Sequence, residues 1–172
     1  MVYENSEFVS QTFKAIDFSN CSFRGSQFVD CVFENCNLSN VNLENVKLQN
    51  IVFKSSKIMG LNFSKCNKFL IKLEFNNCVI SNSIFSGLNL KETKLESCQI
   101  FDSDFFDINL TGASFENSDL NGSRFDNVNL KSSSFKNARN YYLSPVKNNI
   151  KDAKFSFPEV TSLLDCFDIK IV

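Results

Sequence analysis

Residues 105–135 read FFDINLTGASFENSDLNGSRFDNVNLKSSSF, with Phe or Leu at every fifth position. The same phase carries Phe, Leu or Ile without exception at 12 positions from Phe8 to Phe63 and at 13 positions from Phe75 to Phe135. A period of five matches neither the roughly 3.6 residues of an α-helix turn nor the two of a flat strand. It therefore predicts a repeat architecture.

Each five-residue unit combines an inward pair of residues with a corner. We call the Phe, Leu or Ile the central residue. Two positions before it the chain carries mostly small or apolar residues that tolerate burial, and residues two apart on an extended segment point the same way. Two positions after it, 22 of 25 residues are Gly, Asn, Ser or Asp, including all five glycines. Because these residue types accept a positive φ or cap their own backbone, each unit is predicted to be a short extended side that ends in a turn.

A second period, of twenty residues, predicts how the sides close on themselves. From Phe105 onward the central residues alternate between Phe and Leu, and Asn89, Asn109 and Asn129 each precede a central Leu. Four sides then form one coil of twenty residues, with neighbouring coils about 4.8 Å apart. The sequence thus predicts an all-β solenoid, a quadrilateral β-helix with a ladder of asparagines, in which each coil is stabilised by its neighbours.

This pattern resembles the pentapeptide-repeat family. The family motif A(D/N)LXX is approached by Ala113-Ser114-Phe115-Glu116-Asn117 and by Val128-Asn129-Leu130-Lys131-Ser132. The resemblance covers roughly residues 6 to 140 and implies a right-handed quadrilateral β-helix.

We interpret residues 1–172 as a single domain with a first repeat block at 6–65 and a second at 75–140. The spacing between Phe63 and Phe75 is twelve, two more than the period allows. The register break at 66–74 is therefore expected to form a bulge or a short protrusion. Lys65, Lys68 and Phe69 make it a candidate contact loop; a register slip without a role is the alternative.

Residues 141–172 are expected to form a C-terminal tail of a different kind. Ser156-Phe157-Pro158-Glu159 reads as a capping box that starts an α-helix of about ten residues, and Asp168–Val172 alternates like a short strand. The tail is predicted to cap the last coil, to join two copies end to end, or to do both. The candidate cap and dimer residues are Val160, Leu163, Leu164, Phe167, Ile169 and Ile171.

Composition limits the chemistry. The chain has no run approaching 18 apolar residues, no basic or apolar leader at its start and no histidine. We expect a soluble cytoplasmic protein without a membrane span, and no enzyme, catalytic residue, metal site or cofactor. Five of the seven cysteines occupy the inward position two before a central residue, so we interpret them as buried small side chains rather than as redox or metal groups.

The tail is similar in placement and type to that of the quinolone-resistance (Qnr-like) branch of the family. This resemblance implies a protein that binds DNA gyrase or topoisomerase IV, protects them against quinolones, forms a homodimer and acts, in some members, as a mimic of duplex DNA. The alternative is a structural scaffold with another protein partner. Direct nucleic-acid binding is not expected, because the pI is about 5.5 and no Lys or Arg cluster lines up with exposed aromatic residues.

The candidate partner-binding face contains Asp104, Asp107 and Asp126, with Phe101 and Phe106 as outward aromatic anchors. The three acids share one side in the twenty-residue register. Residues 71–135 have a net charge of only −4. Duplex DNA carries one negative charge per ~1.7 Å, so a mimic spanning about three coils would need about nine.

Overall fold

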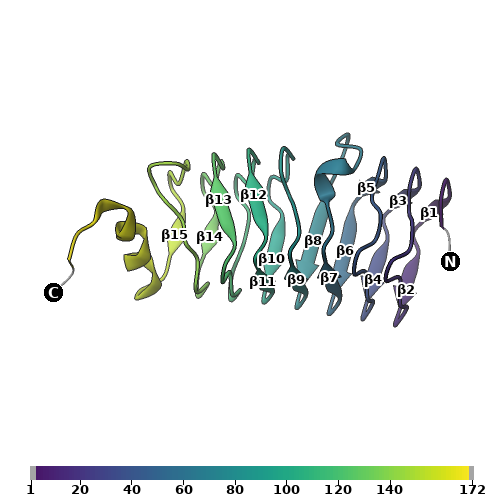
Figure 1. Ribbon diagram of the computed structural model, residues 1–172, viewed down its shortest axis with the longest axis horizontal. Coiled ribbons are helices and arrows are strands. Elements are labelled where there is room, and N and C mark those ends of the chain that lie inside the picture. The colour runs from purple at the N-terminus through teal and green to yellow at the C-terminus, as the bar shows by residue number, and fades with distance from the viewer. Residues whose placement is uncertain (1–2, 171–172) are drawn as a thin grey trace.

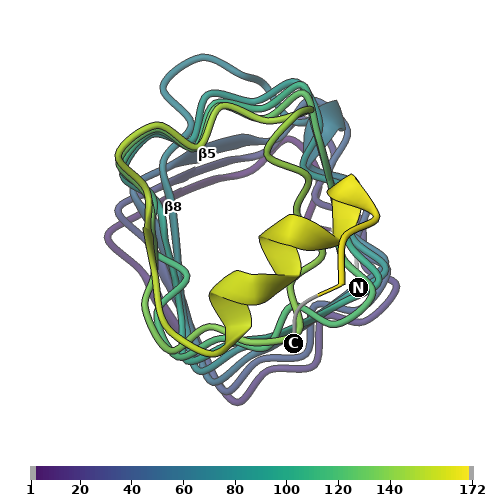
Figure 2. The ribbon, with the colours of Figure 1, turned by 90° about the vertical axis from the view of Figure 1, so that its left-hand side faces the viewer.

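The protein is a rod of stacked coils with the two termini at opposite ends, as a computed structural model that describes residues 3–170 shows (Figure 1). Seen along the rod, the coils superimpose as a four-sided frame (Figure 2). The predicted all-β solenoid is confirmed. No helix within residues 3–170 is long and apolar enough to cross a membrane.

Each coil has four sides, which we number in chain order. Where a side has no assigned strand, isolated parallel bridges connect it to the neighbouring coils. Side 1 contains β1 (Glu7–Val9), β3 (Gln27–Val29) and β5 (Lys47–Gln49). Side 2 contains β2 (Thr12–Lys14), β4 (Val32–Glu34), β6 (Ile51–Lys54), β8 (Leu73–Asn76), β10 (Lys94–Glu96), β14 (Ser134–Phe135) and β15 (Lys154–Phe155). Side 3 contains β7 (Lys57–Met59), β9 (Val79–Ser81) and β11 (Gln99–Phe101), and side 4 contains β12 (Asp104–Phe106) and β13 (Arg124–Asp126).

Neighbouring coils pair in parallel, twenty residues apart. Phe8 lies opposite Phe28 on side 1, and Phe105 lies opposite Phe125 on side 4. Asn89, Asn109, Asn129 and Asn149 form the predicted ladder. The twenty-residue coil predicted from the sequence is therefore confirmed.

The backbone conformation at the corners explains which residues occur two positions after the central residue. Corner residues adopt φ values between 47° and 73°, the left-handed region that Gly, Asn and Asp tolerate best. At Gly122 (φ 73°) a Cβ atom would in addition collide with the carboxylate of Asp102 in the preceding coil.

Columns of rings fill the interior along sides 2 and 4, whereas Leu and Ile are the main central residues of sides 1 and 3. Along side 4 the centroids of Phe63 and Phe85 lie 4.7 Å apart, those of Phe85 and Phe105 5.0 Å, and those of Phe105 and Phe125 4.8 Å, each pair stacked. Stacked rings bury large apolar areas at each coil, which is the main favourable contribution to folding.

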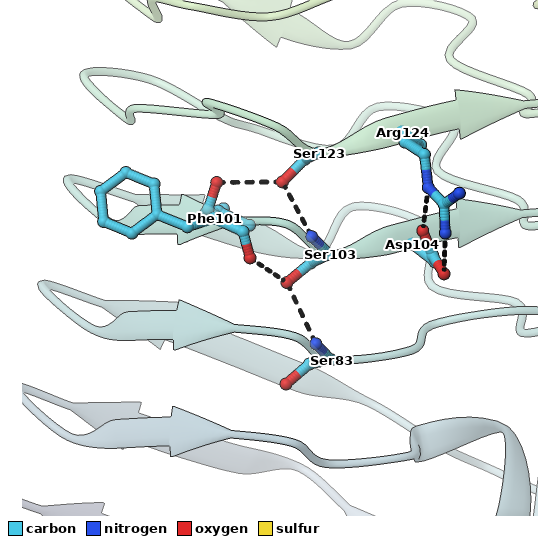
Figure 3. A network of polar contacts seen from close by, with 7 residues as sticks. Ser83, Phe101, Ser103, Asp104, Ser123 and Arg124 are labelled. Atoms are coloured by element: carbon cyan, nitrogen blue, oxygen red, sulfur yellow. Dashed lines mark hydrogen bonds and ion pairs between the residues drawn. The ribbon is translucent and has the colours of Figure 1, made fainter.

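The small inward residues satisfy the backbone at the corners. The Ser103 hydroxyl donates to the Phe101 carbonyl (2.9 Å) and accepts from the Ser83 N–H (3.3 Å) in the preceding coil (Figure 3). Cys98 does the same with its thiol, which accepts from the Cys78 N–H (3.4 Å) and donates to the Glu96 carbonyl (3.3 Å). The Cys98 thiol thus takes the place of a serine hydroxyl. Of the five cysteines predicted to be buried, four are buried and Cys21 is half-buried. Cys66, in the register break, is also buried, and burial raises the pKa of its thiol to about 12.

The two extra residues of the break are accommodated on side 1. Lys47 still pairs with Asn67 at twenty residues, whereas Ile51 pairs with Leu73 at twenty-two. The segment follows a short 3₁₀-helix, η1 (Phe63–Lys65), and stands out from the contour of the coils beside β5 (Figure 2). Both repeat blocks therefore belong to one continuous stack.

The coils continue beyond residue 140, where the repeat was expected to end. Asn129 pairs with Asn149, and β14 pairs with β15 through Phe135 and Phe155. The Asn148 amide replaces the usual inward serine by accepting from the Val128 N–H (2.9 Å) and donating to the Phe125 carbonyl (3.2 Å). A further coil forms because Asn can supply the same hydrogen bonds as Ser.

A helix covers the C-terminal end of the stack (Figure 2), but it is the 3₁₀-helix η2 (Glu159–Phe167) rather than an α-helix. The expected capping box does not form, because the Ser156 hydroxyl accepts the Asn137 N–H (3.0 Å) of the preceding coil. Asp168–Lys170 forms no strand, and Ile171 and Val172 lie outside the described residues.

We expect Phe85→Ala to lower the free energy of unfolding by about 3–5 kcal/mol, because it leaves a cavity in the middle of the ring column. Val146→Ala is the control: its side chain is 72% exposed, and the change should be within about 0.5 kcal/mol. Urea denaturation measures both. Equal stability of the two variants would contradict the role of the ring column.

Candidate partner-binding surfaces

The structure gathers the three candidate acids at side 4, but two of them are paired. The Arg124 guanidinium donates two hydrogen bonds to Asp104, at 2.7 and 2.8 Å (Figure 3). Lys147 lies 3.3 Å from the Asp126 carboxylate. Hydrogen bonding and charge from Asp104 raise the pKa of Arg124. The acidic stripe expected on side 4 is therefore neutralised over much of its length.

The third acid, Asp107, lies at the corner between side 4 and side 1. Its carboxylate accepts the amide N–H of Asn127 at 2.7 Å in the next coil. It remains exposed and carries the one unpaired charge of the three.

The two candidate aromatic anchors lie on different sides. Phe106 ends β12 on side 4, and the Arg124 guanidinium carbon lies 5.3 Å from its ring centroid, a cation–π contact. Phe101 ends β11 on side 3, and its ring points away from Asp104 (Figure 3). Both rings are half-buried rather than exposed. Only Phe106 therefore shares a surface with the acids.

A cleft between side 4 and the C-terminal cap was not foreseen from the sequence. It has a volume of about 590 Å³, within the usual range for binding pockets. Its position depends on how η2 folds back over the last coil, which the repeat does not specify. The lining residues are Phe106, Arg124, Phe125, Asp126, Tyr142, Ser144, Lys147, Asp165, Cys166 and Asp168.

The loop at the register break is strongly exposed. Phe69 is 70% exposed and its neighbour Leu70 is 56% exposed, while Lys65 and Lys68 are exposed as well. Leu70 was missed as a candidate, although it follows Phe69 directly in the sequence. Two adjacent exposed apolar residues on a projecting loop are typical of a contact with another molecule.

In the C-terminal cap, residues three apart lie on the same face of the 3₁₀-helix, so the candidate residues fall on two faces. Val160 and Leu163 face the last coil, with Leu163 9% exposed. Leu164 (39% exposed) and Phe167 (52% exposed) lie on another face, followed by Ile169 (56% exposed). The first pair covers the core, and the other three residues leave an apolar surface at the end of the rod. Ile171 lies outside the described residues.

Among residues 3–170, no group of three or more His, Cys, Asp or Glu side chains could hold a metal ion.

The geometry defines the chain as a quadrilateral parallel β-solenoid with one projecting loop and a helical C-terminal cap. The family model described as a pentapeptide repeat region matches residues 26–105 and 68–135, well over half of the chain. The chain belongs to the pentapeptide-repeat family.

The chain is similar to several proteins of solved structure. A trypsin-treated variant of QnrB1, a plasmid-mediated fluoroquinolone resistance protein, is 19% identical over 99% of this chain and 92% of its own, with a TM-score of 0.41. Full-length QnrB1 is 18% identical over 98% and 97%, with a TM-score of 0.34. HetL from Nostoc sp. strain PCC 7120, a pentapeptide repeat protein involved in heterocyst differentiation regulation, is 10% identical over 88% and 89%, with a TM-score of 0.24. A search of curated proteins finds no match.

Tyr141 lies beneath the C-terminal cap. Its side chain is 3% exposed, and its hydroxyl has no hydrogen-bond partner among the described residues. Burial, and to a lesser degree Glu159, raises its pKa to about 12 from the ordinary 10.0. The unfolded chain therefore loses this proton first, and stability should fall as the pH rises from about 10 towards 12.

Tyr141→Phe should remove this part of the pH dependence and leave stability at pH 8 unchanged or higher by up to about 1 kcal/mol. Urea denaturation of both proteins at pH 8 and pH 11 measures the difference. If both lose the same stability between the two pH values, the proposed environment of Tyr141 is wrong.

Proposed function

We propose that this protein is a non-catalytic binding protein that acts on a type II topoisomerase, DNA gyrase or topoisomerase IV, and protects it against quinolones. The observation that carries protein binding is the loop with adjacent exposed Phe69 and Leu70 on an otherwise regular solenoid. The choice of partner rests on the resemblance of the repeats and the C-terminal tail to the quinolone-resistance branch.

The charge pattern supports binding without imitation of DNA. Side 4 holds Asp104 and Asp126 in ion pairs with Arg124 and Lys147. A mimic of duplex DNA would need a row of unpaired negative charges. Protection in this proposal therefore depends on the loop and on shape rather than on an acidic face.

Gyrase supercoiling assays, with and without a fluoroquinolone, test this function. Titration of the protein should restore supercoiling in the presence of the drug. Phe69→Ala combined with Leu70→Ala should raise the concentration needed by about tenfold, because exposed anchors of this kind contribute most of the energy of an interface. Val146→Ala, which also removes exposed apolar surface, should behave like the wild type. No effect of the wild-type protein on either enzyme would favour a scaffold with another partner.

We further propose that two copies join through the outward face of η2. Leu164, Phe167 and Ile169 form an exposed apolar surface at the end of the rod. Leu164→Asp combined with Phe167→Asp should convert a dimer into a monomer in sedimentation analysis, with an unchanged β-sheet circular dichroism signal. Val146→Asp is the matched control. A dimer that survives the double substitution would place the interface elsewhere.

A further inference from the structure

Side 1 carries a row of lysines that the linear sequence hides. Its outward positions from residue 47 onward, together with loop residues 67–70, hold no acidic residue, apart from the acids at its corners. We call these lysines the lysine stripe; all are exposed except half-buried Lys47, and they are Lys47, Lys68, Lys91, Lys131 and Lys151. Lys72 lies beside them at a corner, next to Glu92 of the following coil. Because they are spread over more than a hundred residues, they come together only through the register of the coils.

Each of the other three sides holds at least one ion pair between coils, although Glu96 and Glu116 repeat the same sign on side 2. Opposite charges twenty residues apart pair on side 2 (Lys14 with Glu34, 3.2 Å), on side 3 (Arg139 with Asp119, 3.0 Å) and on side 4 (Arg124 with Asp104, 2.7 Å). Within the described residues, the lysines of side 1 thus form no ion pair, although acidic residues flank them at the corners.

Two lysines of the stripe are stacked on one another in adjacent coils, although like charges repel. Asn129 pairs with Asn149, so Lys131 and Lys151 occupy the same outward position in adjacent coils. Like charges directly opposite each other on paired strands are destabilising. Proteins keep such destabilising arrangements mainly at functional sites, here a site where the two lysines would contact another molecule.

The surroundings of the stripe indicate which external group fits. Asp30, Glu92 and Asp152 occupy the corners along one edge of side 1, and Asp107 occupies a corner along the other. A long polyanion or an anionic membrane would meet these acids as well. The exposed Phe69 and Leu70 project beside the lysines and need an apolar recess. Next to the loop, hollows of about 340 and 380 Å³ are both lined by Lys72, Lys91 and Glu92, so the surface has relief and charges of both signs at this corner.

We propose that side 1 is a docking surface for an acidic patch of a protein partner that also offers an apolar recess to Phe69 and Leu70. This inference rests on the proposed function and names the surface of the topoisomerase that would be bound. A DNA mimic would occupy the enzyme's DNA-binding surface, which is basic, whereas side 1 fits an acidic region outside it.

The sign of a charge-reversal effect tests the proposal. Lys131→Glu combined with Lys151→Glu reverses the stacked pair. Lys136→Glu combined with Lys154→Glu makes the same charge change in the same two coils on side 2, where both lysines are exposed. Binding of each variant to immobilised gyrase and to topoisomerase IV is measured by biolayer interferometry at low and at physiological salt, after circular dichroism has confirmed folding.

If side 1 is the docking surface, the Lys131/Lys151 reversal should weaken binding by about tenfold or more. The Lys136/Lys154 control should weaken it by no more than about twofold. Equal effects of the two reversals, or tighter binding after reversal on side 1, would overturn the proposal, and tighter binding would favour a basic surface on the enzyme. A wild-type protein that binds neither enzyme would remove the proposed function and this inference together. Binding of a labelled 30-base-pair duplex that the side 1 reversal abolishes would assign the stripe to nucleic acid instead.

Discussion

The parallel pairing of residues twenty apart is the constraint on which the rest of the structure depends. It places Phe105 over Phe125 in the interior and Asp104 over Arg124 on the surface in the same step. Every outward residue therefore has fixed neighbours in the coils before and after it. The surface consists of straight columns, and its electrostatic character is set by whether the signs within a column alternate or repeat.

Irregularity in this protein is confined to places where the pairing rule is relaxed. Two extra residues between Asn67 and Leu73 suffice to raise Phe69 and Leu70 out of a flat side without disturbing the coils on either side of it. At the C-terminal end, Arg124 pairs with Tyr142 at eighteen residues, and the normal spacing returns at Asn149. The cap then closes the last coil. The exposed apolar residues that suit a partner occur mainly at these two places, because the regular coil turns its large apolar side chains inward.

The repeat could be predicted from the sequence because each of its positions has a separate physical requirement: a large apolar side chain at the centre, a small or apolar residue that tolerates burial two positions before it, and a positive φ at the corner. The tail could not, since its residues serve the coil and the cap at once. The sequence predicts Ser156 as a helix cap, yet its hydroxyl accepts a hydrogen bond from the Asn137 N–H. Asn148, beyond the predicted end of the repeat, makes the hydrogen bonds that serine makes in other coils. The pairing of Asp104 with Arg124 was visible in the twenty-residue register, but counting net charge over a segment concealed it.

Net charge is a poor guide to what a solenoid binds, because the fold sorts residues by position and not by proximity in the sequence. A chain with a net charge of −1 still builds one side whose lysines form no ion pair among the described residues, while Asp104 and Asp126 on side 4 are paired with Arg124 and Lys147. Attraction between proteins depends on these local fields, since a salt-containing solvent screens charges farther apart than about 8–10 Å. A partner that approaches side 1 therefore meets a positive column and a projecting apolar loop, and the negative charge elsewhere on the rod has little influence on that encounter.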